Sequence, residues 1–334
     1  MMAAKGMKNV KVLCVDEDGL LTCKGYRLFD ETGTLRIVDG KYALLSHFAL
    51  MRRFFRAEIT GLYNLKNGNR LAIAKKGLFL QKEGSSRFEK CFAIRRGSKP
   101  LNICVKPEGE LFFGEYFQNK EKKAVNIYCS NDDAKTWHVV YSFPEGSINH
   151  IHGLFHDPYT NRIWLATGDL ENECVIGWTD DGFKTVTEVF RGGQEFRTCQ
   201  LFFYRDFVVF ATDSQYMKNE IKCFDRKTLG IRTLAKIQGS AIKGGQKDDV
   251  AFLSTPIEPS EVNKDLFAHI WMTRDGLHWK EVYAARKDGW PFILQFGTFE
   301  FPQYRSSITD KLYCSGRALK GCDGKTLCID IANV

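Results

Sequence analysis

Two histidines that alternate with apolar residues, His150 and His152 in the stretch HIHG, are the clearest candidates for chemistry in this sequence. Side chains two positions apart in a β-strand point to the same face, so these imidazoles are expected about 7 Å apart. Such a pair can transfer protons near neutral pH, bind a metal ion, or simply bond to backbone and carboxylate groups. The sequence is compatible with all three interpretations.

Three carboxylates follow strand-like runs at matching positions: Glu115 after ELFFG, Asp169 after RIWLATG and Asp213 after FVVFAT. Groups in matching positions of consecutive repeats are expected to lie near one another and to affect each other's protonation. We predict His150, His152, Glu115 and Asp169 as catalytic residues that act as acid and base at a glycosidic bond. The alternative is an ionic lining in which the carboxylates pair with basic side chains.

Basic and amide side chains in similar positions are predicted to bind the substrate, together with Asp213. They are Arg56, Lys75, Gln194, Arg197 and Arg317. The arginine guanidinium can form bidentate hydrogen bonds with a carboxylate or phosphate, so the expected partner is an acidic sugar or glycan. The one cofactor that these residues suggest is a divalent metal ion at His150 and His152, and no cofactor is required by the prediction.

A turn that recurs along the chain shows which elements would position these residues. It reads SNDDAKTW from Ser130, TDDGFKTV from Thr179 and TRDGLHW from Thr273. Its aspartates, Asp132, Asp181 and Asp275, are separated by 49 and then 94 residues, so one repeat is about 47 to 49 residues long. Each copy lies between two β-rich runs, which predicts a hairpin turn bonded internally by its Asp and Ser or Thr side chains.

These turns resemble the Asp box of sialidases and other propellers with bacterial neuraminidase-type repeats. The blocks GEY, HIHG, TGD and GGQ-x-FR also resemble bacterial proteins labelled as sialidase-like or glycosyl-hydrolase repeat proteins. The resemblance implies an all-β, sialidase-like β-propeller and a carbohydrate-related role. We therefore expect a hydrolase or lyase that acts on an acidic sugar or glycan, or alternatively a noncatalytic sugar-binding or protein-interaction scaffold.

The repeat length divides 334 residues into about seven units, which predicts one domain over 1–334 with seven four-stranded antiparallel blades, or alternatively six. The predicted blades span 9–40, 57–95, 100–143, 149–190, 197–237, 241–285 and 291–331. Because the last has three strands, a strand near Val10 to Val15 is expected to complete it. Residues 41–55 are expected to form a short helix or a long loop. The candidate residues should meet at the channel mouth, opposite the Asp turns.

Composition excludes several classes of function. A net charge of +8 without an arginine-rich tract argues against nucleic-acid binding. No apolar run approaches the roughly 18 residues of a membrane helix, and the first residues lack the apolar region of a secretory signal, so a cytoplasmic protein is expected. Eleven cysteines without a Cys-x-x-Cys pair are expected to be reduced thiols in the core.

Overall fold

The structure is a computed structural model that describes residues 4–6 and 9–334. The chain forms two compact units. The first comprises Met1–Thr34, Ala43–Glu58 and Gln200–Val334, and the second comprises Leu35–Tyr42 and Ile59–Cys199. Most of the candidate site residues lie in the second unit.

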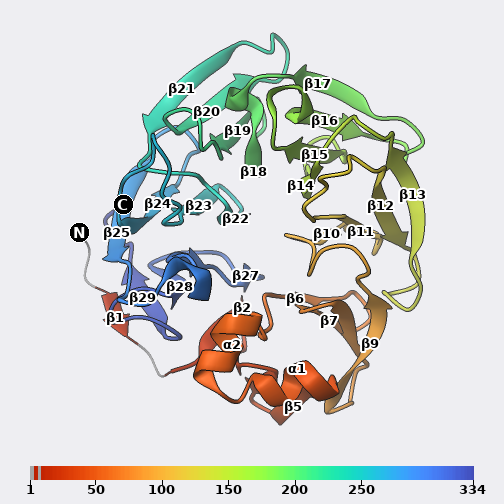
Figure 1. The fold of residues 1–334 in the computed structure, drawn as a ribbon, viewed down its shortest axis with the longest axis vertical. Helices are drawn as coiled ribbons and strands as arrows, with labels where there is room; N and C mark the ends of the chain where they lie inside the picture. The colour runs from red at the N-terminus through yellow and green to blue at the C-terminus, as the bar shows by residue number, and fades with distance from the viewer. Residues whose placement is uncertain (1–3, 7–8) are drawn as a thin grey trace. The chain divides into compact units, whose positions relative to one another are not determined.

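The second unit consists of antiparallel strands that pair in chain order (Figure 1). Its first group is β6 (Gly61–Asn64), β7 (Arg70–Ala74), β8 (Gly77–Gln81) and β9 (Arg87–Ala93). The next four-stranded sheet is β10 (Cys104–Val105), β11 (Leu111–Gly114), β12 (Val125–Ser130) and β13 (His138–Phe143). The third is β14 (His150–His156), β15 (Ile163–Gly168), β16 (Val175–Thr179) and β17 (Thr187–Arg191). β18 (Thr198–Phe203) begins in this unit and continues into the first.

The first unit repeats the same up-and-down pairing. After β18 come β19 (Phe207–Thr212), β20 (Glu220–Asp225) and β21 (Ile231–Lys236), and then the sheet of β22 (Lys243–Lys247), β23 (Val250–Thr255), β24 (Phe267–Thr273) and β25 (Lys280–Arg286). Near the N-terminus lie β2 (Lys11–Asp16), β3 (Gly19–Lys24) and β4 (Arg27–Asp30), followed by β5 (Gly33–Ile37). The last sheet contains β26 (Thr298–Glu300), β28 (Lys311–Arg317) and β29 (Thr326–Asp330).

The N-terminal segment does complete the last sheet, but with a different strand from the one predicted. β1 (Ala4–Gly6) pairs antiparallel with β29, with Ala4 opposite Ile329. The residues near Val10 to Val15 belong instead to β2, which pairs antiparallel with β3 and parallel with the short strand β27 (Gln303–Tyr304). The β-type residues of that run therefore predict a strand correctly, whereas its partner depends on residues distant in sequence.

Helical structure is confined to short segments. Residues 41–55 were expected as a helix or loop, and they form α1 (Gly40–Leu45) and α2 (Ala49–Phe55). Three short 3-10 segments follow: η1 (Glu171–Glu173), η2 (Gln194–Phe196) and η3 (Phe292–Leu294). Within 4–6 and 9–334, no helix combines the length and apolar character needed to cross a membrane.

The three Asp turns join the third and fourth strands of their sheets, as predicted. In the second copy, the Thr179 hydroxyl donates to Asp181 Oδ1 at 2.8 Å and accepts the Phe183 amide at 3.0 Å. The Thr185 amide donates to Asp181 Oδ1 at 3.0 Å. In the shorter third copy, His278 Nδ1 takes the position of the threonine hydroxyl, 2.6 Å from Asp275 Oδ2. Bonding inside the turn explains why the motif is readable in the sequence.

Aromatic side chains in these turns fasten each sheet to the preceding one. The Phe183 ring is 1% exposed and lies 5.6 Å from the ring of Phe112, which belongs to β11. In the preceding turn, the Trp137 ring lies 6.2 Å from that of Phe92, on β9. Burying one such side chain contributes roughly 1.5–3 kcal/mol. The second unit thus has apolar clusters packed between its neighbouring sheets.

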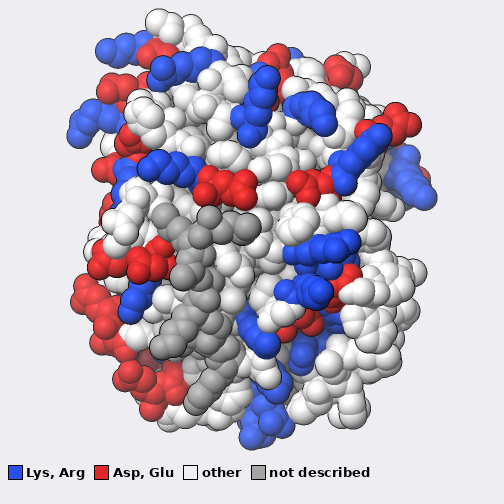
Figure 2. All heavy atoms as spheres, turned by 90° about the vertical axis from the view of Figure 1, so that its left-hand side faces the viewer, with Lys and Arg blue, Asp and Glu red and all other residues white. Residues whose placement is uncertain are grey.

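Cysteines and charges are distributed as the composition suggested. None of the eleven cysteines, all of which lie within the described residues, forms a disulfide, and nine are buried, in agreement with the prediction of thiols in the core. Burial raises the pKa of Cys104 to about 12, so this thiol stays protonated at neutral pH. Basic and acidic side chains both spread over the face shown in Figure 2.

Candidate functional site

The two histidines lie at the start of β14, where the strand departs from regular pairing. His150 pairs with Gly168 on β15 and Ile151 with Thr167, but the next pair is Gly153 with Ala166. His152 is therefore the additional residue of a β-bulge, and a bulge re-aims the side chain that it carries. The two ring centroids are 5.0 Å apart, closer than regular strand alternation predicts.

Gly168, the last residue of β15, makes room for the His152 ring. A Cβ atom at this position would lie 2.4 Å from His152 Cε1 and 2.9 Å from Nε2. Any residue with a side chain would therefore displace the imidazole. Glycine is needed at this position of the TGD sequence because a side chain would not fit. Its backbone φ is outside the left-handed region, so backbone conformation alone does not call for glycine.

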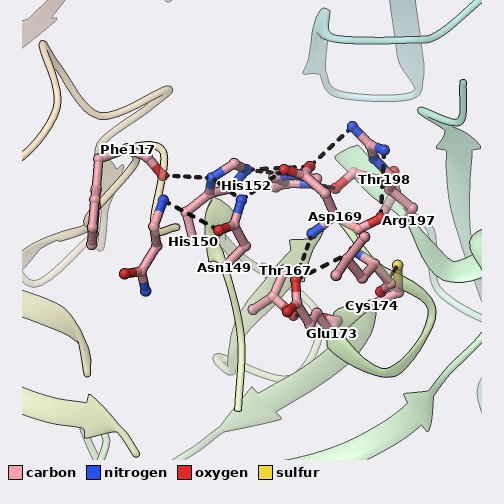
Figure 3. A network of polar contacts seen from close by, with 12 residues as sticks. Phe117, Asn149, His150, His152, Thr167, Asp169, Glu173, Cys174, Arg197 and Thr198 are labelled. Atoms are coloured by element: carbon pink, nitrogen blue, oxygen red, sulfur yellow. Dashed lines mark hydrogen bonds and ion pairs between the residues drawn. The ribbon is translucent and has the colours of Figure 1, made fainter. Parts of the chain in front are cut away.

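Backbone carbonyls fix the orientation of both rings (Figure 3). His150 Nδ1 lies 2.9 Å from the carbonyl oxygen of Phe117, and His152 Nδ1 lies 3.0 Å from that of Thr198. A carbonyl oxygen can only accept, so each Nδ1 carries the hydrogen and donates it. The rings are buried, with His150 5% and His152 2% exposed, and each Nε2 is the atom left for chemistry.

The two Nε2 atoms converge on one carboxylate oxygen. They are 3.1 Å apart, and Asp169 Oδ1 lies 3.3 Å from the His152 atom and 3.4 Å from the His150 atom. With the hydrogens on Nδ1, both neutral rings direct a lone pair into this space, and the carboxylate adds another. Three electron-rich atoms at these distances repel one another unless a proton or a cation lies among them.

Three side chains hold Asp169. Arg197 Nη2 lies 2.9 Å from Oδ1, and Asn149 Nδ2 donates to Oδ2 at 2.8 Å. Gln194 Nε2 donates to the backbone oxygen of Asp169 at 2.8 Å. Burial acts to raise the pKa of Asp169, but hydrogen bonds and charge from His150 and His152, which require a proton on their Nε2 atoms, outweigh it and hold the pKa well below its usual range. The group is a carboxylate at neutral pH, and with 29% of its side chain exposed it connects the cluster to solvent.

Glu115 is committed to different partners. Its Oε1 accepts from Arg96 Nε at 2.9 Å, and its Oε2 accepts the Asn126 amide at 2.9 Å and pairs with Arg96 Nη2. The next residue, Tyr116, packs its ring 4.3 Å from the His150 ring. Glu115 therefore adjoins a residue that packs against His150, while its carboxylate bonds to Arg96.

A cavity of about 350 Å³ lies next to this contact. Its lining combines basic, acidic and aromatic side chains, among them Phe92, Arg95, Arg96, Lys99, Phe113, Glu115, Tyr116 and Tyr128. Tyr116 belongs both to the cavity wall and to the packing around His150. The cavity carries more basic than acidic side chains.

The other predicted residues are Lys75, Arg56, Asp213 and Arg317. Lys75, in the second unit, lies with Nζ 5.3 Å from the centre of the Tyr42 ring. In the first unit, Arg56 is an exposed residue that caps α2, and Asp213 is a buried residue that follows β19. Arg317, also in the first unit, pairs with Glu58 at 2.6 Å and Glu300 at 2.7 Å.

Among the predicted residues, the structure gathers His150, His152, Asp169, Gln194 and Arg197. Sequence reasoning missed Asn149 and Tyr116, and it missed the carbonyl oxygens of Phe117 and Thr198. Every residue has a backbone carbonyl, so residue types in the sequence do not indicate which carbonyls bond to the histidines. The position of Asn149 directly before HIHG was the one local signal for its role.

Comparisons with known proteins give structural similarity without sequence similarity. No model of a protein family matches the chain, and no curated protein matches it. A catalytically inactive virginiamycin B lyase from Staphylococcus aureus, with quinupristin, aligns over 99% of this chain and 100% of its own, with 11% identity and a TM-score of 0.59. An oligogalacturonate lyase in complex with manganese aligns over 98% and 91%, with 8% identity and a TM-score of 0.57.

A puromycin hydrolase mutant complexed with PGG aligns over 92% of this chain and 52% of its own, with 9% identity and a TM-score of 0.53. These proteins are β-propellers, so the comparisons confirm the predicted fold class: all-β, with four-stranded antiparallel sheets. The number of blades stays a prediction. Identities this low identify a fold and no reaction, because one fold supports many functions.

Proposed function

We propose that this protein is an enzyme that acts on an acidic sugar or glycan, as a lyase in preference to a hydrolase. Its reaction would take place at the cluster of His150, His152 and Asp169, called here the imidazole–carboxylate centre. The observation that carries the proposal is the convergence of both Nε2 atoms on Asp169 Oδ1 within 3.4 Å. A purely structural role would require neither this convergence nor the bulge that creates it. We also propose that the Asp turns are the Asp boxes of a sialidase-type repeat.

The substrate class follows from charge and shape. Arg197 lies at the edge of the centre, and Arg95 and Lys99 line the adjacent cavity. Guanidinium and ammonium groups bind carboxylates, while aromatic walls such as that of Tyr116 pack against the apolar face of a sugar ring. A uronic acid, which combines a ring with a carboxylate, fits this combination of groups.

The bonding of Glu115 favours elimination over hydrolysis. Glycoside hydrolysis usually needs two carboxyl groups about 5–9 Å apart, one of them ready to donate a proton. Two other carboxylates of the second unit are occupied: Glu115 by Arg96 and the Asn126 amide, and Glu173 by Lys122 and the amides of Asp169 and Leu170. Within the second unit, the centre therefore has one carboxylate, Asp169, and two imidazoles in place of a pair of carboxylates.

In an elimination, a proton passes from the carbon next to the substrate carboxylate to a base, which is water or a basic side chain, a double bond forms, and the bond from the adjacent carbon to the leaving sugar oxygen breaks. That oxygen then takes up a proton. Negative charge builds up on the substrate carboxylate during the first step, and fixed positive charge stabilises it. Within this scheme Arg197, together with any cation held by the imidazole–carboxylate centre, would hold the substrate carboxylate and stabilise that charge.

The test is turnover on a panel of uronic-acid polymers. Lyase activity produces an unsaturated sugar with ultraviolet absorbance, whereas hydrolysis produces new reducing ends without it. We expect absorbance to appear and His152→Ala to reduce the rate on the order of 100-fold or more, the usual cost of losing transition-state stabilisation of this kind. His156→Ala is the control, because His156 lies on the same strand and bonds to Asn161.

Each other outcome rejects a defined part of the proposal. Reducing ends without absorbance would show a hydrolase. Binding of the polymers without turnover would show a noncatalytic sugar-binding propeller. Absence of both binding and turnover, or equal rates for His152→Ala and wild type, would reject the site itself.

A further inference from the structure

We infer that the imidazole–carboxylate centre binds a divalent transition-metal ion through His150 Nε2, His152 Nε2 and Asp169 Oδ1. The inference deepens the proposed function and rests on it for the role of the ion, which would supply the positive charge that meets the substrate carboxylate. Binding of the ion is nevertheless a property that can be measured without any substrate.

The distances among the three atoms match the edges of a coordination polyhedron. They are 3.1, 3.3 and 3.4 Å. A circle through the atoms has a radius of about 1.9 Å, slightly less than the roughly 2.0–2.2 Å bonds that such ions make to nitrogen and oxygen. An ion bonded to all three would lie about 1 Å out of their plane, with its remaining positions open. Three protein ligands with an open position are typical of catalytic metal sites.

The surroundings of the three atoms also fit a metal site. A histidine that binds a metal through one nitrogen usually donates the other N–H to a carbonyl or carboxylate. Both Nδ1 atoms make such bonds, to Phe117 and Thr198, and these bonds direct the Nε2 lone pairs inward. Asn149 fixes the second oxygen of Asp169 and leaves Oδ1 facing the histidines.

A shared proton is the competing occupant of this space. A proton lies close to the line between its two heavy atoms, so it would bridge the nitrogens of His150 and His152 at 3.1 Å. A proton shared by the two nitrogens does not explain why Asp169 Oδ1 is nearly equidistant from them, at 3.3 and 3.4 Å. A central cation accounts for all three distances together.

The ligand set and the nearby charges define the ion. Two imidazole nitrogens and one carboxylate oxygen favour manganese, iron, cobalt or zinc over magnesium and calcium, which prefer oxygen ligands. Arg197 offsets the negative charge of Asp169, to which it is bonded at 2.9 Å. The ion would therefore keep most of its double positive charge, and an anionic substrate group would complete its coordination.

The experiment is titration of metal-free protein, prepared with a chelator, with MnCl2. Calorimetry gives the stoichiometry, and electron paramagnetic resonance follows the loss of the hydrated manganese signal. We expect one ion per chain, with MgCl2 binding more weakly. His152→Ala and Asp169→Asn should each weaken binding by about 100-fold or more, since even residues that only orient ligands contribute 10–100-fold. His156→Ala should bind as wild type does.

Two variants are used so that a folding defect in one does not decide the result, and circular dichroism verifies the fold of each. Absence of manganese and zinc binding by the wild type would overturn the inference, as would unchanged binding by both variants. A protein that cleaves uronic-acid polymers after chelation also overturns it while leaving the proposed function intact. A protein that binds the ion at these residues but processes no polymer would overturn the proposed function alone.

Discussion

Gly168→Ala tests whether the position of the His152 ring, rather than its presence, creates the centre. The added methyl group would lie 2.4 Å from Cε1, 2.9 Å from Nε2 and 3.3 Å from Nδ1 of His152. Ordinary contacts require more than 3.4 Å, so the ring must move by about 1 Å. The bond from Nδ1 to the Thr198 carbonyl holds the ring in its present position, and a shift of this size breaks it.

The expected cost has two parts. Overpacking in a buried site destabilises by about 1–3 kcal/mol, and a lost hydrogen bond by about 0.5–1.5 kcal/mol. The free energy of unfolding should therefore fall by about 2–4 kcal/mol. Manganese affinity and turnover should fall by 10–100-fold, because the nitrogen is displaced although no ligand is removed.

Urea unfolding measures the stability change, and the manganese titration measures the displacement. Gly289→Ala is the matched control, because its methyl group would meet nothing within 4 Å. A Gly168→Ala protein with wild-type metal affinity and turnover would refute the argument that the ring must occupy this position.

Two further predictions concern the scaffold. Hydrogen bonds from the Thr185 backbone and hydroxyl lower the pKa of Asp181 to about 2, so its contribution to stability is complete above about pH 4 and is lost as the pH falls towards 2. Asp181→Asn should therefore destabilise at neutral pH and lose most of that difference at about pH 2, and a pH-independent difference in urea unfolding would contradict this. A chain that begins at Asn9 lacks β1, leaves the edge of β29 unpaired and should melt at a lower temperature and aggregate more readily, whereas an unchanged melting temperature would exclude a role for β1.

Features with local causes were predictable from the sequence. The Asp turns could be located because Thr179, Asp181 and Thr185 bond to one another within seven residues. Alternating apolar residues predicted the strands for the same reason, since the period of a strand is a local property. Asp169 was identified as a candidate site residue because it directly follows the strand-like run RIWLATG, whose end could be estimated from the sequence.

Features that depend on distant partners were not predictable. Glu115 occupies the same kind of position as Asp169, but its carboxylate is taken by Arg96, which lies 19 residues earlier in the chain. The pairing of β1 with β29 links the two ends of the sequence. Nothing in the residue types near Glu115 or Ala4 specifies these partners, because each is determined by how the sheets pack.

The bulge at His152 shows how a departure from a regular pattern produces the candidate site. Regular alternation would place the two imidazoles about 7 Å apart, farther than their ring centroids lie in the structure. The extra residue brings the Nε2 atoms to 3.1 Å, but it interrupts the pairing of β14 with β15 and requires a glycine at position 168. A regular strand would pair better, so the bulge gives the sheet itself no advantage. Local rules that fail at one place in an otherwise consistent fold usually fail at a functional site. The convergence of His150, His152 and Asp169 at that place is therefore the strongest reason to locate the chemistry of this protein there.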